Sequence, residues 1–253
     1  MKNIHIKDII IGQGKPKICI PIVATDIEEA RKQATEIMTY PVDIVEIRAD
    51  FLEKCFEVEY TLEVIKAVNE IISVPVIYTF RTKNEGGEKS ISRDDYINLI
   101  KKVLESGIVD LVDVELFTGD EFVTDLIKYA HKCGVRVIVS NHEFGRTPIK
   151  IDLILRLVKM QTLGADIAKI AVMPKNKSDV LTLLDATAEA YEQYMEIPIV
   201  TMSMGKDGMI SRMTGEVFGS CMTFGCVGKT SAPGQIEANR LATALDIIHR
   251  QIK

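Results

Sequence analysis

The sequence predicts an α/β fold of the (β/α)8 TIM barrel type with a short N-terminal β-hairpin. Short apolar segments of strand length alternate eight times with amphipathic segments of helix length. The 253 residues match the roughly 250 that one such barrel needs, and no linker or low-complexity segment divides them. An open doubly wound sheet is the alternative, but no GxGxxG motif follows the first core strand. We therefore expect a single domain over residues 1–253.

The elements are expected in a regular order. Residues 4–11 have β-type composition with Gly12 and Gly14 as turn residues, which predicts a hairpin leading into the first core strand. The core strands are expected at residues 17–23, 42–48, 74–81, 109–115, 135–140, 164–171, 197–202 and 220–224. The helices that follow them are expected at residues 26–38, 61–72, 94–106, 121–133, 150–163, 178–194, 208–213 and 235–251.

The composition indicates a globular protein that acts on small molecules. Apolar residues make up 47% of the chain and charged residues 26%, and the net charge of -5 argues against nucleic acid or an anionic membrane as partner. The five cysteines are scattered without a CxxC pair or zinc-ligand spacing, which favours free thiols in a reducing cytoplasm. The N-terminal segment lacks the apolar run of a signal peptide, and no run of 18 apolar residues predicts a membrane span.

One lysine interrupts the apolar strand expected at residues 164–171. Strand alternation places Lys169 on the same face as Ile167 and Ala171. A desolvated amine at the end of such a strand is a nucleophile that forms an imine with a carbonyl compound. The alternative is a lysine whose stem packs on apolar neighbours while its charge reaches solvent.

Polar side chains also gather where the predicted strands end, and in a (β/α)8 barrel these ends build the active site. They are Glu46 and Arg48, Arg81 and Glu85, Asn141 and His142, Lys169, Met202 and Met204 with Arg212, and Ser231 and Gln235. Each has a structural alternative, such as an ion pair between Glu46 and Arg48 or core packing of the methionines. Their convergence on one rim favours a common site. The glycines of segment 225–235 suit a mobile lid, under which Arg212, Ser231 and Gln235 are expected to anchor a carboxylate.

Seven short motifs, in this order along the chain, resemble those of type I 3-dehydroquinate dehydratases, the imine-forming lyases of the shikimate pathway of chorismate and aromatic amino acid biosynthesis. The motifs are Glu46-Ile-Arg48, Phe80-Arg-Thr-Lys-Asn-Glu-Gly-Gly-Glu88, Ser140-Asn-His-Glu-Phe144, Ala168-Lys-Ile-Ala171, Met202-Ser-Met-Gly205, Ser211-Arg-Met213 and Ser231-Ala-Pro-Gly-Gln235. The match runs along nearly the whole chain. Any one motif is weak, and the combination is specific.

The resemblance implies a role for each residue. Lys169 matches the lysine that forms the imine, His142 the general base and acid, and Glu85 the carboxylate that orients the histidine. The positions that hold the hydroxyls and the carboxylate of 3-dehydroquinate are matched by Glu46, Arg48, Arg81, Arg212, Ser231 and Gln235. The implied reaction is syn elimination of water to 3-dehydroshikimate, without metal or organic cofactor, in a cytoplasmic homodimer. The residue before the histidine varies among relatives and is Asn141 in this chain.

The residue types suit that chemistry. An iminium is an electron sink that makes the neighbouring proton acidic, and histidine exchanges protons near neutral pH. Three arginines suit an anionic, polyhydroxylated substrate. Two alternatives remain open: a lysine-dependent class I aldolase or transaldolase, and a non-catalytic metabolite-binding barrel in which Lys169 is only a counter-ion. The first class usually acts on phosphorylated sugars, and segment 225–235 lacks the GxxxxGK[ST] spacing of a phosphate loop.

Overall fold

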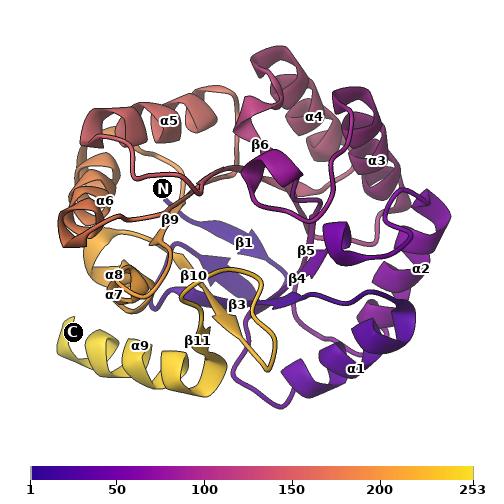
Figure 1. Cartoon of the computed structure of the whole chain (residues 1–253), viewed down its shortest axis with the longest axis horizontal. Coiled ribbons are helices and arrows are strands. Elements are labelled where there is room, and N and C mark those ends of the chain that lie inside the picture. Colours follow the sequence, from indigo (N-terminus) through magenta and orange to yellow (C-terminus); the bar gives the residue numbers. More distant parts are fainter. Residues whose placement is uncertain (1, 253) are drawn as a thin grey trace.

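A ring of parallel strands surrounded by helices forms the molecule, as the expected (β/α)8 barrel requires (Figure 1). The computed structural model of the chain describes residues 2–252. The strands of the ring are β3 (Lys17–Ile22), β4 (Ile44–Arg48), β5 (Val76–Thr79), β6 (Leu111–Glu115), β7 (Arg136–Glu143), β8 (Ile167–Val172), β9 (Ile199–Ser203) and β10 (Met222–Cys226). The sheet order β11-β10-β3-β4-β5-β6-β7-β8-β9 follows the chain, with the short β11 (Ile236–Glu237) added beside β10.

The ring closes between β9 and β10 through a narrow seam. One parallel bridge joins Ile199 to Ser220, and the backbone N–H of Cys221 donates to the Ile199 carbonyl over 2.9 Å. The Thr201 N–H donates to Ser220 Oγ over 2.9 Å, so a side chain replaces a ladder hydrogen bond. The short segment before β10 therefore completes the barrel.

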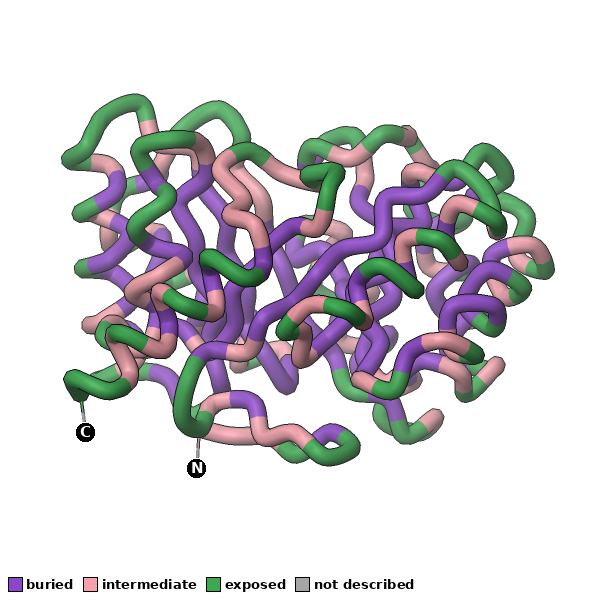
Figure 2. Tube along the Cα trace, turned by 90° about the horizontal axis from the view of Figure 1, so that it is seen from below, coloured by how far each residue is buried: buried purple, intermediate pink, exposed green. Residues whose placement is uncertain are grey.

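The helices cover the outside of the ring, and the apolar residues pack in two layers. The helices are α1 (Ile27–Ile37), α2 (Val58–Asn69), α3 (Arg93–Ser106), α4 (Asp120–Lys132), α5 (Lys150–Thr162), α6 (Lys177–Glu189), α7 (Met209–Met213), α8 (Gly215–Phe218) and α9 (Ala238–Ile252). Three 3-10 turns, η1 (Ala49–Phe51), η2 (Lys83–Glu85) and η3 (Leu116–Thr118), follow β4, β5 and β6. Most strand residues are buried (Figure 2). Their apolar side chains belong to two clusters, one shared with the helices outside the ring and one inside it. None of the helices within residues 2–252 has the length and apolarity to cross a bilayer.

The expected N-terminal hairpin is present and seals one end of the barrel. Strands β1 (Ile4–Ile6) and β2 (Ile9–Ile11) pair in antiparallel fashion. Ile6 and Ile11 are buried in the same apolar cluster as Ile44 and Ile138 from the ring, and β1 lies across the centre of the barrel in Figure 1. The accessible end of the barrel is therefore the one formed by the C-terminal ends of the strands.

Several predicted boundaries were wrong. Helix α2 begins three residues before the predicted position. No side chain caps this helix, so the sequence carries no signal that marks its start. The predicted helix over 178–194 changes at residue 190 into the π-helical turn η4 (Ala190–Tyr194). The last helix begins after Glu237, whose carboxylate accepts from the Asn239 and Arg240 N–H groups, so the predicted start at residue 235 was early. Strand β7 runs on to Glu143 because it pairs with β8 over its whole end.

Candidate active site

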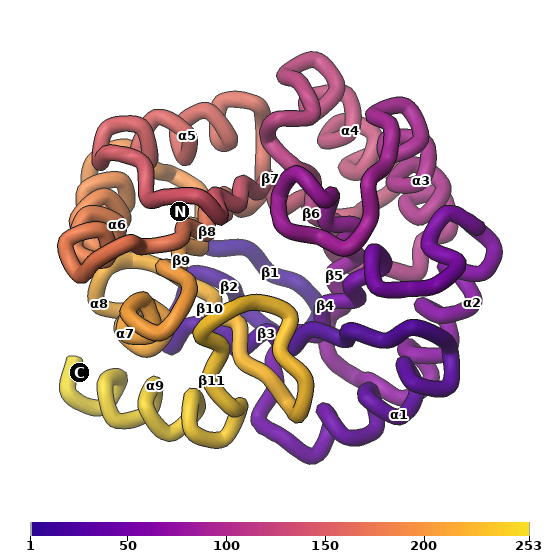
Figure 3. The backbone as a smooth tube through the Cα atoms, in the orientation of Figure 1, coloured from indigo at the N-terminus to yellow at the C-terminus, as the bar shows by residue number. Residues whose placement is uncertain are grey.

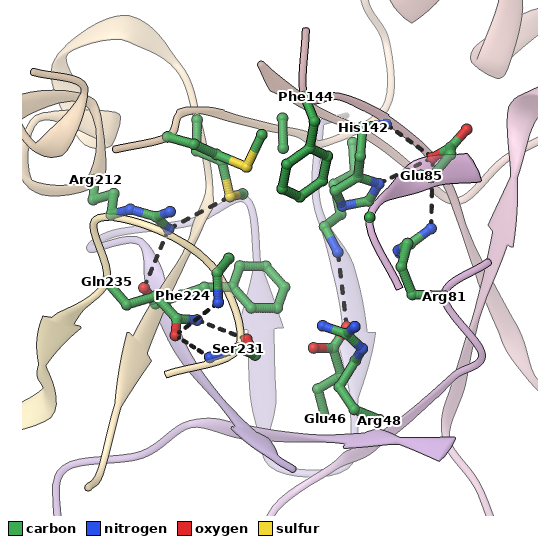
Figure 4. A pocket seen from close by; sticks show the side chains of 16 residues that line it. Glu46, Arg48, Arg81, Glu85, His142, Phe144, Arg212, Phe224, Ser231 and Gln235 are labelled. Atoms are coloured by element: carbon green, nitrogen blue, oxygen red, sulfur yellow. Dashed lines mark hydrogen bonds and ion pairs between the residues drawn. The ribbon is translucent and has the colours of Figure 1, made fainter. Parts of the chain in front are cut away.

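A single pocket at the C-terminal end of the barrel brings together all nine predicted site residues (Figure 4). They come from six separate segments of the chain, and the empty space of the pocket, which is open to solvent, measures ≈ 450 Å³. Its other lining residues are Gly86, Phe144, Ala171, Met202, Met204, Phe224 and Ala232.

Lys169 occupies the third position of β8, so it lies inside the strand and not at its end as predicted. Its side chain points into the barrel with Ile167 and Ala171, as strand alternation predicts. The lysine is 3% exposed, and Nζ lies 4.4 Å from the ring centroid of Phe224. Nζ also donates to Asp113 Oδ2 over 3.3 Å and lies 3.8 Å from Glu46 Oε1. The amine therefore faces the pocket from a desolvated position with carboxylates beside it.

His142 is held by Glu85 at two points. The backbone N–H of His142 donates to Glu85 Oε2 over 2.8 Å, and the ring Nδ1 lies 3.1 Å from the same oxygen. When Glu85 is ionised, its carboxylate only accepts, and this contact then places the ring proton on Nδ1 and leaves Nε2 as the free nitrogen. Burial, and then the charges of Arg81, Lys169 and Arg48, hold the pKa of His142 well below its ordinary value. The imidazole is therefore neutral and able to accept a proton.

Glu85 is under opposing influences. Burial and the nearby Glu115 carboxylate raise the pKa of Glu85 to about 8, although Arg81, the His142 N–H and the Asn141 amide each act to lower it. The closest of the charged groups, Arg81 Nη1, lies 3.7 Å from Glu85 Oε2. The charge of Glu85 near neutral pH thus depends on the donors around it.

Arg81 is occupied by the protein itself. Its Nη1 donates to Glu115 Oε1 and Ser140 Oγ, each over 3.0 Å, and its Nη2 donates to Asp113 Oδ1 over 2.8 Å. Burial acts to lower the pKa of Arg81, but the carboxylates around it raise the pKa well above its ordinary value. The guanidinium therefore connects the surroundings of Glu85 with those of Lys169.

Arg48 is also paired, but with a carboxylate that lies outside the pocket. Its Nε and Nη2 donate to the two oxygens of Asp50 over 2.8 Å each, and Asp50 also accepts from the Glu88 N–H over 3.1 Å. Glu46 instead accepts from Thr79 Oγ1 over 2.8 Å. Within residues 2–252, Glu46 and Arg48 therefore do not form the structural ion pair that was the alternative. Both side chains keep a face toward the pocket.

Arg212 differs from the other two arginines in having no anionic partner. It is 1% exposed, and its Nη groups donate only to the carbonyls of Phe224, over 3.3 Å, and Pro233, over 3.1 Å, with a long contact to Met202 sulfur. Its Nε is buried without a hydrogen-bond partner, and no ion pair within residues 2–252 includes Arg212. Burial lowers the pKa of Arg212 to about 10. A buried guanidinium without a counter-ion, open to a pocket, is suited to an anion.

Ser231 and Gln235 lie beside Arg212 in the segment between β10 and β11, which arches over the barrel opening (Figure 3). Gln235 Nε2 donates to Ser231 Oγ over 3.0 Å, and Gln235 Oε1 accepts from the Ser231 N–H over 2.7 Å. Pro233 O accepts from the Gly205 N–H over 3.1 Å. A Cβ at Gly234 would lie 2.3 Å from the Gly205 carbonyl, so only glycine permits this contact.

The sequence interpretation missed Asp113 and Asp50. Asp113 is wholly buried beneath Lys169, and Ser140 Oγ donates to it over 2.6 Å. Its alternation with Glu115 along the strand would have placed both in the barrel interior, by the rule that placed Glu46 and Arg48. It was missed because only residues at strand ends were considered. Phe144 was missed because its place follows from loop geometry, since it packs on Gly86, where a Cβ would lie 2.1 Å from the phenyl ring.

Comparison with known proteins identifies the family. Residues 18–252 match the family model described as type I 3-dehydroquinase. The chain is 48% identical over 251 residues to a 3-dehydroquinate dehydratase of Escherichia coli (strain SE11), covering 99% of this chain and 100% of that protein. It is 46% identical over 252 residues to one of Clostridioides difficile (strain 630), covering 99% of each.

Solved structures agree with the sequence comparison. A crystal structure of a type I 3-dehydroquinate dehydratase from Clostridium difficile, described as carrying covalently modified comenic acid, superimposes with a TM-score of 0.96 at 46% identity. It covers 100% of this chain and 99% of its own. A 3-dehydroquinate dehydratase from Geobacillus kaustophilus gives a TM-score of 0.96 at 37% identity, with 100% and 98% coverage. The chain thus belongs to the type I 3-dehydroquinase family.

Proposed function

We propose that the chain removes water from 3-dehydroquinate to give 3-dehydroshikimate through an imine on Lys169, with His142 as the general base and acid. One observation carries the proposal. A buried amine and a neutral imidazole face the same pocket, and its other side carries Arg212, a buried cation without a counter-ion. Family membership supports the same activity.

The substrate carboxylate is proposed to bind Arg212, Ser231 and Gln235. It supplies the negative charge that Arg212 lacks and accepts from the unpartnered Nε–H. Ser231 and Gln235 now bond to each other and exchange this contact for the ligand. The hydroxyls of the ring then face Glu46 and Arg48, which Thr79 and Asp50 hold in place.

The covalent step takes place at Lys169. The free amine attacks the ketone carbon to give a carbinolamine. Protonation of the carbinolamine hydroxyl and its loss as water leave an iminium. The Asp113 and Glu46 carboxylates, 3.3 Å and 3.8 Å from Nζ, stabilise this cation. The C. difficile relative whose structure is described as carrying a covalently modified acid supports covalent chemistry in this family.

His142 then moves the protons. Its Nε2 takes the proton next to the iminium carbon, and the electron pair of that C–H bond moves to form an enamine. The enamine returns its electrons to expel the β-hydroxyl, which leaves as water after taking the proton from His142. One imidazole serves both steps from one face of the ring, which gives syn elimination. Hydrolysis of the conjugated imine releases the product and restores the amine.

An assay with a trapping step tests this function against both alternatives. Absorbance of the conjugated enone, measured in the ultraviolet with 3-dehydroquinate as substrate, reports the dehydration. Borohydride added during turnover should inactivate the enzyme and add the ligand mass to the peptide that holds Lys169, and not to the neighbouring Lys175 or Lys177. A binding barrel gives neither signal, and an aldolase gives trapping with its own substrate but no enone from 3-dehydroquinate.

We further propose that the protein is a homodimer of the reducing cytoplasm. Helices α5 and α6 lie side by side on the barrel surface (Figure 1) and present Ile151, Leu155 and Leu181, each more than half exposed. An apolar surface of this kind supports association with a second copy. The five cysteines, all free thiols, support a reducing compartment. Sedimentation of wild-type protein and a Leu155→Glu variant measures the assembly.

A further inference from the structure

A chain of hydrogen bonds leads from the surface helix α5 to the proposed catalytic histidine. Arg156 Nη1 donates to Asn141 Oδ1 over 2.6 Å, and Asn141 Nδ2 donates to Glu85 Oε1 over 3.3 Å. The other oxygen of Glu85 contacts the Nδ1 of His142 (Figure 4). Asn141 is 2% exposed and adjoins His142 in β7. The contacts thus connect four side chains in series, from the helical layer to the pocket.

The chemistry of the two ends fixes the orientation of the amide between them. A guanidinium has only donors, and an ionised carboxylate has only acceptors. Asn141 therefore satisfies both with its oxygen toward Arg156 and its NH2 group toward Glu85. Arg156 is itself held by Glu143 Oε2 at 3.1 Å and by the Phe117 ring, whose centroid lies 5.4 Å from Cζ. The donor at Glu85 is consequently fixed in direction.

We propose that Arg156 and Asn141 are positioning residues for the reaction, which favour the ionised form of Glu85 and fix its direction, so that His142 keeps its proton on Nδ1 and presents Nε2 to the substrate. The inference rests on the proposed roles of His142 and Glu85. It explains why an amide, with one donor end and one acceptor end, stands before the histidine in this chain. A carboxylate there would face Glu85 with a like charge.

The surroundings of Glu85 show why a second donor matters. Arg81 lies beyond the end of β5, Glu115 ends β6, and Asn141 and His142 belong to β7, with Arg156 behind them on α5. Lys169 and Arg48 act on His142 from β8 and β4. Burial and Glu115 favour the neutral carboxyl, and the pKa of Glu85 is already raised to about 8. Loss of the Asn141 donor moves it further in the same direction, and a neutral Glu85 no longer polarises the Nδ1–H group.

Kinetics of matched variants test the proposal. Arg156→Ala should lower kcat about tenfold, the effect of one charged hydrogen bond, with KM within about twofold. The acid limb of the kcat–pH profile should move to higher pH by about half a unit or more. Arg156→Lys, which keeps the charge, should recover most of both effects. The control is Lys159→Ala, which removes an ion pair with Asp120 at 2.7 Å from the same helix, away from β7. It should match wild type.

Asn141→Asp gives the sharpest contrast because it changes one NH2 group for an oxygen without changing shape. A carboxylate at this position pairs with Arg156, stays ionised and keeps Glu85 protonated, so kcat at pH 7 should fall at least about a hundredfold. Thermal melting of each variant separates this effect from instability. Equal kcat in Asn141→Asp and wild type, or a pH profile of Arg156→Ala that superimposes on that of Lys159→Ala, overturns the proposal.

A measurement on the free protein separates this proposal from the proposed function. The chain has four histidines, so the ¹⁵N ring signals of His142 can be assigned by their loss in His142→Gln. The Nδ1 signal reports the titration of Glu85. The pH at the midpoint of this titration should rise in Arg156→Ala by the same amount as the acid limb of the kcat–pH profile. An unchanged midpoint overturns the positioning role. Absence of dehydratase activity in wild type overturns the proposed function and leaves the midpoint shift as an independent result.

Discussion

Asp113 Oδ2 lies 3.3 Å from Lys169 Nζ in a part of the barrel where Asp113 is 1% exposed. Burial acts to raise the pKa of Asp113, but the charges of Arg81 and Lys169 outweigh it and lower the pKa below its ordinary value. The carboxylate is therefore a permanent anion beside the reactive nitrogen. In the proposed mechanism it stabilises the iminium, which is the cationic form of the imine that acts as an electron sink.

The variant Asp113→Asn keeps the shape and removes the charge, so we expect at least a tenfold loss of kcat, by about the value of one charged hydrogen bond. Borohydride should trap less imine at equal substrate saturation. Asp166→Asn is the control, because Asp166 is also buried and paired with an arginine, Arg136 at 2.9 Å, but at the other end of β8. Equal kcat losses in both variants, in proportion to their melting temperatures, would show that Asp113 acts only on stability.

His142→Ala should lower kcat by about 10²–10⁴-fold, the usual contribution of a general acid–base group. The neutral imidazole faces the pocket and has no substitute at its position. Imine formation should persist, detected as a ligand adduct by mass spectrometry after borohydride reduction. The contrary result is a variant that keeps near wild-type kcat.

Arg212→Lys keeps the charge but loses the second parallel donor, so substrate should bind about ten- to a hundredfold more weakly. The kcat should fall as well, because the carboxylate anchor orients the ring that reacts. The matched substitution Arg136→Lys, at the closed end of the barrel, should leave both constants unchanged. Wild-type binding and turnover by Arg212→Lys would exclude this anchor.

Closure of the lid is expected to protect the peptide bond after Lys229 from trypsin when substrate is bound. Lys229 is exposed in the segment between β10 and β11 and pairs with Glu29 of α1. The cleavage rate at this bond, followed by mass spectrometry, should fall on adding ligand, while cleavage after an exposed lysine elsewhere, such as Lys102, stays constant. Equal protection at both sites, or at neither, argues against a closing lid.

Glu85 should make the stability of the protein depend on pH. Its pKa is about 8 in the folded chain and 4.5 ordinarily, so the folded state binds the extra proton between these values. The stabilisation is complete below pH 4.5 and is lost as the pH rises to about 8, on the order of a few kcal/mol. Urea unfolding at several pH values should show this decline in wild type and a smaller decline in Glu85→Gln. Parallel curves for the two proteins contradict the prediction.

The sequence predicted the barrel and the composition of the pocket because both follow from local rules. Alternation decides which strand residues face the interior, and the ends of parallel strands meet at one rim, so both rules assign Glu46, His142 and Lys169 to the same site. Contacts that depend on which strands are neighbours were not predictable in this way. Asp113 reaches Lys169 only because β6, β7 and β8 curl together, and Arg156 reaches Asn141 only through the packing of α5.

The narrow seam between β9 and β10 has a consequence for the dynamics of the barrel. Six residue pairs join β7 to β8, whereas one bridge joins β9 to the residues before β10. A strand boundary with so few residue pairs needs less free energy to open. Its amide hydrogens should therefore exchange with solvent before those between β7 and β8. Arg212 follows β9, whereas Ser231 and Gln235 follow β10. The residues of the proposed carboxylate site therefore come from both sides of this seam. Local opening there would weaken binding of the carboxylate, whereas Lys169 on β8 and His142 on β7 lie in fully paired strands and would stay in register.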